Sequence, residues 1–132
     1  MGEHIIQTAA LVHGKRVLVV EDSGLTADEI VYGLEDLGCA PVGPAATMEH
    51  ARELLDGHVV DCALLDVNLD GVYVFPLADL LMQRQIPFIL TTGYGAAHLP
   101  EAYRDCPKLE KPFSDDELAR AIAALFRTAS CR

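Results

Sequence analysis

The sequence predicts a single doubly wound α/β domain, with a five-stranded parallel sheet and helices on both of its faces. Short, unbroken runs of apolar residues alternate along the chain with segments in which apolar residues recur at helical spacing, and this alternation repeats five times. The chain has 132 residues, of which 51% are hydrophobic and 23% charged. That length and balance match one globular domain with a substantial core, and unbroken apolar strands are typical of parallel sheets covered on both sides.

The regular pattern begins near Arg16, so residues 1–14 are expected to form an extension and residues 15–132 the domain. The first strand is expected at residues 17–20, a run of valine and leucine. A helix should follow it, because Thr26 and Glu29 form a capping-box pattern ahead of helically spaced apolar residues.

The later elements are predicted from the same signals. Thr47 should cap a helix, and Ser114 with Glu117 forms a second capping-box pattern. The segment at residues 96–103 is the weakest helix, because Pro100 interrupts it. The remaining strands are expected at residues 40–42, 62–65, 87–91 and 108–110, and the remaining helices at residues 47–57, 76–83 and 114–125.

The charge of the chain argues against some classes of partner. With 20 acidic and 10 basic residues, its formal net charge is −10, and such a surface repels nucleic-acid phosphates and anionic lipid. No apolar run approaches the roughly 18 residues of a membrane span, and no signal-peptide pattern opens the chain. We therefore expect a cytoplasmic protein that binds neither nucleic acid nor membrane.

Polar side chains follow the predicted strands at their carboxyl ends. Glu21 and Asp22 follow the first strand, Asp66 the third, Thr92 the fourth and Lys111 the fifth. Because parallel strands end at one edge of a sheet, these side chains should converge there. Crowded carboxylates favour binding of a hard cation such as Mg²⁺. A metal ion beside a free carboxylate, with an ammonium and a hydroxyl opposite, is an arrangement that suits phosphoryl transfer.

Each motif alone has a simpler interpretation. The Glu21–Asp22 pair could precede a helix, Lys111 could lie on the surface, and the residues after Asp66 could form an ordinary turn. The D-x-N-x-D sequence that starts at Asp66 also resembles the nucleophile loop of haloacid-dehalogenase-like phosphatases, although Asn68 stands where that loop has its second aspartate. A small aspartate-based phosphatase is therefore an alternative, although the short loops are expected to offer no substrate pocket.

Four motifs occur in this order along the chain: V-L-V-V-E-D, L-L-D-V-N, P-F-I-L-T-T-G and L-E-K-P-F. Through these motifs the chain resembles the receiver domain of bacterial two-component response regulators. The resemblance spans about residues 15–127 and implies a flavodoxin-like sheet with strand order 2-1-3-4-5. It implies that Asp66 accepts a phosphoryl group from a sensor histidine kinase. It also implies Mg²⁺ bound by Asp22 directly, by Glu21 mainly through water, by Asp66 and by the backbone carbonyl of Asn68.

The same resemblance assigns roles to two further residues. Thr92 would donate its hydroxyl to the phosphoryl group and Lys111 would pair with it, and the peptide bond between Lys111 and Pro112 would be cis. Such a domain is not an enzyme on other substrates, because it catalyses only its own phosphorylation and dephosphorylation. A pseudo-receiver that binds partners without phosphorylation is a further alternative, against which the complete acidic, lysine and threonine set argues.

A second resemblance concerns the subgroup. The sequence V-F-P-L-A-D followed by P-F-I-L-T-T-G-Y-G is similar to the FAT-GUY group of alphaproteobacterial receivers, although Leu90 and Thr91 replace its Phe and Ala and Tyr94 comes one place early. That group is linked with HWE-class histidine kinases, and many members lack an output domain. The resemblance implies a stand-alone receiver that binds a downstream protein or exchanges its phosphoryl group with a histidine phosphotransfer protein, and it leaves a homodimer open.

The response to phosphorylation is expected in residues 93–103. Most receivers carry an aromatic residue three positions before the lysine of the site, where this chain has Lys108. A charged side chain cannot fill an apolar slot in the same way, so the weak helical segment is expected to shift or order, with Tyr94 as its reporter. The alternative is a fixed loop with Tyr94 as a surface aromatic.

Overall fold

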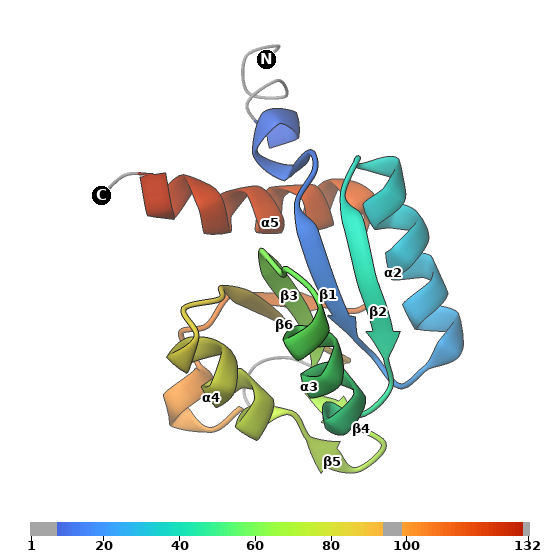
Figure 1. The fold of residues 1–132 in the computed structure, drawn as a ribbon, viewed down its shortest axis with the longest axis vertical. Coiled ribbons are helices and arrows are strands. Elements are labelled where there is room, and N and C mark those ends of the chain that lie inside the picture. Colours follow the sequence, from blue (N-terminus) through green and yellow to red (C-terminus); the bar gives the residue numbers. More distant parts are fainter. Residues whose placement is uncertain (1–7, 94–98, 131–132) are drawn as a thin grey trace.

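The computed structural model describes residues 8–93 and 99–130, which form a five-stranded parallel sheet with helices on both faces (Figure 1). The order of the strands is β2-β1-β3-β6-β7. The five are β1 (Arg16–Val20), β2 (Ala40–Ala45), β3 (Cys62–Asp66), β6 (Phe88–Thr92) and β7 (Lys108–Glu110). Numbered within this sheet, the order is 2-1-3-4-5, which confirms the predicted fold.

The helices divide between the two faces of the sheet. They are α2 (Gly24–Asp36), α3 (Met48–Gly57), α4 (Phe75–Gln83) and α5 (Asp115–Ser130), with a short 3-10 helix, η2, at Glu101–Tyr103. Leu18 and Val20 of β1 join a core with α3 and α4, whereas Val17 and Val19 join a second core with α2 and α5. Adjacent residues of one strand thus pack into the cores on opposite faces of the sheet, as expected of a sheet buried on both faces. None of the helices among the described residues is long and apolar enough to cross a membrane.

Part of the expected N-terminal extension packs against the domain. Residues 8–12 are helical, and Val12 is buried in the core formed with α2 and α5. The Cys39 thiol donates a hydrogen bond to the carbonyl oxygen of Val12 over 3.3 Å. Residues 1–7 lie outside the described residues.

The predicted helix caps are confirmed at two helices and wrong at one. The hydroxyl of Thr47 accepts a hydrogen bond from the backbone of α3, and the Ser114 and Glu117 side chains make the two reciprocal bonds of a capping box at α5. Helix α2, however, begins at Gly24, with Ser23 as its cap. The expected cap at Thr26 was wrong because Ser23 lies closer to the end of β1, and its hydroxyl already accepts a bond from the Thr26 amide.

Several segments differ from the prediction in extent, among them α5, which runs to Ser130 where its end was expected at residue 125. Strand β2 runs on to Ala45, and residues 68–73 form an unpredicted hairpin of β4 (Asn68–Leu69) and β5 (Val72–Tyr73). The expected weak helix at residues 96–103 is described only from residue 99, where it is the three-residue η2, and Tyr94 lies outside the described residues. The Lys111–Pro112 bond is cis, as expected.

The bend in β2 depends on Gly43, whose φ of +99° lies in the region that other residues avoid. A Cβ placed there would lie 2.9 Å from the Ala45 amide nitrogen and 3.1 Å from the Val19 carbonyl oxygen. We expect Gly43→Ala to lower the free energy of unfolding by about 2 kcal/mol or more in urea titrations. Gly57→Ala is the control, because a Cβ at that helical position meets nothing within 4 Å. Equal stability of the two variants would contradict the prediction.

Candidate functional site

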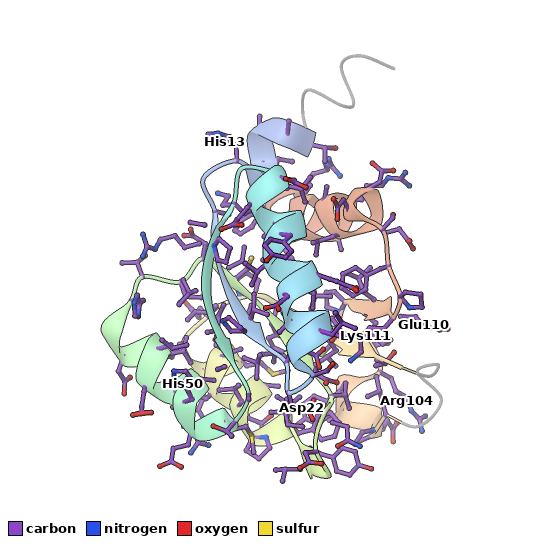
Figure 2. All side chains as sticks on the ribbon, turned by 90° about the vertical axis from the view of Figure 1, so that its right-hand side faces the viewer. His13, Asp22, His50, Arg104, Glu110 and Lys111 are labelled. Carbon is purple, nitrogen blue, oxygen red and sulfur yellow. The ribbon has the colours of Figure 1, made fainter. Side chains whose placement is uncertain are left out.

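The candidate site lies at the carboxyl edge of the sheet. Glu21 and Asp22 follow β1, Asp66 ends the neighbouring strand β3, Thr92 ends β6, and Lys111 follows β7. Figure 2 shows Asp22 and Lys111 close to one another at this edge. The strands are parallel and adjacent, so residues up to 90 positions apart in the sequence meet here.

Three carboxylates form the acidic part of the site. One oxygen from each of Glu21, Asp22 and Asp66 lies within 4.8 Å of the others. Glu21 and Asp66 are buried, with 3% and 6% of their surfaces exposed, whereas Asp22 is open to solvent. Burial, reinforced by a hydrogen bond and charge repulsion from Glu21, raises the pKa of Asp66 to about 7. The ionised form of Asp66 is therefore costly unless a cation compensates it.

Lys111 supplies one such cation. Its Nζ lies 3.0 Å from Glu21 Oε1 and 3.3 Å from Asp66 Oδ2. Burial alone would lower the pKa of Lys111, but the hydrogen bond to Glu21 and the charges of Asp66 and Glu21 outweigh it, so the pKa is raised. Lys111 is thus held as an ammonium that bridges the two buried carboxylates.

Backbone groups fix the orientation of both buried carboxylates. The amide of Ser23 donates to Glu21 Oε2 over 3.1 Å, and the amide of Asn68 donates to Asp66 Oδ1 over 3.3 Å. The Asn68 side chain in turn accepts a bond from the Gly71 amide over 2.6 Å, which closes the turn between β4 and β5. The loop after Asp66 is therefore anchored directly to the site.

Thr92 is positioned through the backbone. Its carbonyl oxygen accepts a hydrogen bond from the Lys111 amide over 2.7 Å, and its side chain is largely buried. Among the described residues no hydrogen bond joins the Thr92 hydroxyl to the acidic cluster. The structure thus brings Glu21, Asp22, Asp66 and Lys111 into one group and places Thr92 on the adjoining strand.

Some contacts near the site were not predicted from the sequence. Lys108 donates from Nζ to the carbonyl oxygen of Arg104 and, over 2.8 Å, to that of Cys106. The hydroxyl of Tyr103 donates to Asp79 over 2.6 Å. Both link the segment that follows β6 to the rest of the domain. The bonds of Lys108 are local, to residues four and two positions earlier in the chain. The bond from Tyr103 to Asp79 has no local sequence signal, because its partners are 24 positions apart and are brought together only by the fold.

A cavity of about 340 Å³ lies beside the site, between α2 and the start of α5. Its lining includes Thr26, Ile30, Lys111 and Phe113 but not Asp66. The cavity shares Lys111 with the site without giving a small substrate access to the Asp66 carboxylate.

The donor set suits a hard divalent cation. Three carboxylates offer oxygen ligands of the kind that Mg²⁺ prefers, and the solvent-exposed Asp22 leaves room for the waters that Mg²⁺ retains. The repulsion between Asp66 and Glu21 is what such an ion would relieve.

The burial of Asp66 beside Glu21 has a measurable consequence in EDTA. Because the pKa of Asp66 is raised to about 7, its ionisation destabilises the folded state as pH rises toward 7. Asp66→Asn should therefore raise the free energy of unfolding by about 1 kcal/mol at pH 8, and this gain should vanish below about pH 4, where the acid is protonated in both states. Added Mg²⁺ should stabilise only the parent. Thermal melts in which the variant is the less stable protein in EDTA at pH 8 would contradict this.

Comparison with known proteins identifies the family. The family model described as response regulator receiver domain matches residues 17–123. The chain is 31% identical over 114 residues to the transcriptional regulatory protein PdtaR of Mycobacterium tuberculosis, an alignment that covers 82% of this chain and 55% of PdtaR. It therefore spans about half the length of this curated relative.

Solved structures agree with that family. SdrG from Sphingomonas melonis is 37% identical with a TM-score of 0.76, over 87% of this chain and 98% of SdrG. The response regulator PhyR from Brucella abortus is 27% identical with a TM-score of 0.76, over 98% of this chain and 56% of PhyR. Together with the parallel sheet and the acidic cluster at its carboxyl edge, these matches show that the chain belongs to the response regulator receiver domains of two-component signalling and is similar to alphaproteobacterial receivers.

Proposed function

We propose that this chain is a receiver that accepts a phosphoryl group on Asp66 from a sensor histidine kinase and signals through the phosphorylated state. The observation that carries the proposal is the placement of Asp66. Its buried carboxylate lies beside two other carboxylates and 3.3 Å from the Lys111 ammonium, at the end of the central strand.

The proposed reaction is a direct transfer. A carboxylate oxygen of Asp66 attacks phosphorus, an O–P bond forms, and the P–N bond of the kinase phosphohistidine breaks, leaving the imidazole on the kinase. Lys111, already beside Asp66 Oδ2, is placed to pair with an oxygen of the transferred group. Thr92, at the end of the adjoining strand, would donate its hydroxyl to another. Both interactions act on charge that spreads over the phosphoryl oxygens.

Four groups would hold Mg²⁺ in this reaction. They are the carboxylates of Glu21, Asp22 and Asp66 and the backbone carbonyl of Asn68. When bound, the ion supplies positive charge to the phosphoryl oxygens and favours the ionised form of Asp66. The raised pKa of the metal-free Asp66 makes this requirement strong, because only the carboxylate form is nucleophilic.

The proposed partners follow from the family and from the extent of the matches. Receiver domains act with histidine kinases, and the subgroup resemblance points to a kinase of the HWE class or to a histidine phosphotransfer protein. PhyR of Bartonella quintana is described as an anti-anti-sigma factor, but the match covers 55% of it. A downstream protein bound in the phosphorylated state is therefore proposed without a named partner.

The test is uptake of phosphoryl groups from acetyl phosphate, followed by intact-protein mass spectrometry. We expect the parent protein to gain one phosphoryl group with Mg²⁺ and none in EDTA. A histidine kinase of the HWE class should transfer its phosphoryl group under the same Mg²⁺ requirement. Uptake at an equal rate in EDTA would contradict the metal role. No uptake from either donor with Mg²⁺ would favour a pseudo-receiver.

A further inference from the structure

An aromatic column stands on the surface next to the candidate site. The rings of Phe75 and Tyr103 stack with centroids 4.4 Å apart, and the ring of Tyr73 also stacks on Phe75, with centroids 6.0 Å apart. Tyr73 and the adjacent Val72 are 58% and 53% exposed. Three segments thus contribute to one apolar surface: the hairpin after Asp66, the start of α4 and η2.

The border of this surface is acidic. Asp70 lies in the turn of the hairpin, Asp79 lies one helical turn after Phe75, and Glu101 opens η2; all three are exposed. Among the described residues, the cations of the segment around η2 direct their donors to backbone carbonyls: Arg104 donates from Nε to Leu99, and Lys108 donates to Arg104 and Cys106. A complementary partner segment would therefore combine apolar side chains with arginine or lysine.

The column is tied to Asp66 through short backbone links. The Asn68 amide donates to Asp66 Oδ1, and Asn68 pairs with Tyr73 across the hairpin. The Val67 amide donates to the carbonyl oxygen of Thr91 over 3.1 Å, so the loop also contacts β6. A change at the Asp66 oxygens therefore alters the hydrogen bond from the Asn68 amide, and Asn68 is the residue that pairs with Tyr73 in the hairpin.

We propose that Val72 and the Tyr73–Phe75–Tyr103 column form the docking surface for a basic, apolar segment of the downstream protein, and that phosphorylation of Asp66 strengthens this docking. The regulation of docking by phosphorylation rests on the proposed function, whereas the docking surface itself does not. Figure 1 shows the hairpin and α4 at one end of the molecule. Helix α2 packs in the core on the other face of the sheet from α4. The surface is thus separate from the cavity between α2 and α5.

The test uses a short synthetic peptide of arginine, leucine and tryptophan, and a matched peptide with glutamate in place of arginine. Backbone amide shifts are followed by NMR in EDTA and with beryllofluoride and Mg²⁺, which imitate the phosphorylated state. We expect the arginine peptide to shift the hairpin and η2 amides and to bind roughly fivefold or more tightly in the beryllofluoride state. Equal binding of the glutamate peptide, or shifts centred elsewhere, would overturn the proposal.

Two matched variants locate the contact. Tyr73→Ser should weaken binding of the arginine peptide roughly tenfold, as loss of an aromatic anchor does. Tyr32→Ser on α2 is the control, because Tyr32 is 65% exposed but lies on the other side of the sheet. Equal weakening by both variants would overturn the assignment to the column.

Phosphoryl uptake by parent and variants, measured by intact mass, separates the two proposals. Normal uptake without peptide binding overturns the docking surface and leaves the proposed function standing. If the parent protein takes up no phosphoryl group, the proposed function is overturned. In that case, binding of the arginine peptide to the column in EDTA still decides whether the docking surface exists.

Discussion

Replacing Asp66 with asparagine is expected to reduce phosphoryl uptake from one group per chain to none. The substitution keeps the size of the side chain and an oxygen that can accept the bond from the Asn68 amide. It removes the nucleophile, because an amide oxygen does not form a stable bond to phosphorus under these conditions, and it removes the charge that faces Lys111. The measurement is intact mass after incubation with acetyl phosphate and Mg²⁺.

Asp70→Asn is the matched control for this loss. Asp70 lies in the same loop but is exposed and does not belong to the acidic cluster. Its positive φ of 52° is one that asparagine adopts readily. This variant should take up a full phosphoryl group. Full uptake by Asp66→Asn, or loss of uptake in Asp70→Asn, would contradict the assignment.

The largest expected effect on stability comes from Leu64→Ala. Leu64 lies in the central strand β3, between Val19 of β1 and Ile89 of β6, and only 1% of it is exposed. Its side chain belongs to the core that α2 and α5 cover. Truncation leaves a cavity that the sheet cannot close, so we expect a loss of about 3 kcal/mol, a large share of a typical domain stability of about 5–15 kcal/mol.

The control for this variant is Leu25→Ala. Leu25 is 74% exposed in the first turn of α2, so the same change of side chain should cost no more than about 0.5 kcal/mol. Urea titrations of both variants give the difference in free energy of unfolding from the shift of the unfolding midpoint, provided that the dependence on urea concentration is unchanged. Equal losses in the two variants would show that β3 is not the centre of the core.

The fold was predictable where local patterns and burial agree. Strands β3 and β6 begin with unbroken apolar runs, and the caps at Thr47 and Ser114 act within one helical turn. The start of α2 was placed too late, because Ser23 and Thr26, three positions apart, both have cap-forming side chains and only the geometry of the chain leaving β1 selects Ser23. The two-residue strands of the hairpin after Asp66 are too short for any periodicity to reveal.

The site was predictable to a similar extent. Convergence of Glu21, Asp22, Asp66 and Lys111 follows from the parallel order of the strands, whatever the side-chain conformations are. The bridge that Lys111 makes between Glu21 and Asp66 depends on those conformations and on burial, which the sequence does not contain.

The same limit applies to contacts between distant segments. The stacking of Tyr103 on Phe75 and the bond from Tyr103 to Asp79 require both segments to be in place first. The bonds from Lys108 to the carbonyls of Arg104 and Cys106 are local, but they depend on the conformation of the segment that precedes β7. The sequence indicated only that Lys108 would not fill an apolar slot as an aromatic residue at that position does. The use of its ammonium as a tether for the segment that follows β6 was found only in the structure.

Chemical trapping of the phosphorylated residue tests the central claim most directly. An acyl phosphate on aspartate is reduced by borohydride to homoserine, which survives proteolysis and can be located by peptide mass spectrometry. After incubation with acetyl phosphate and Mg²⁺, we predict homoserine at position 66 and at no other position. Homoserine at Asp22 or another acidic residue, or a phosphoryl group that resists borohydride because it is carried by a histidine, serine or threonine, would contradict the account.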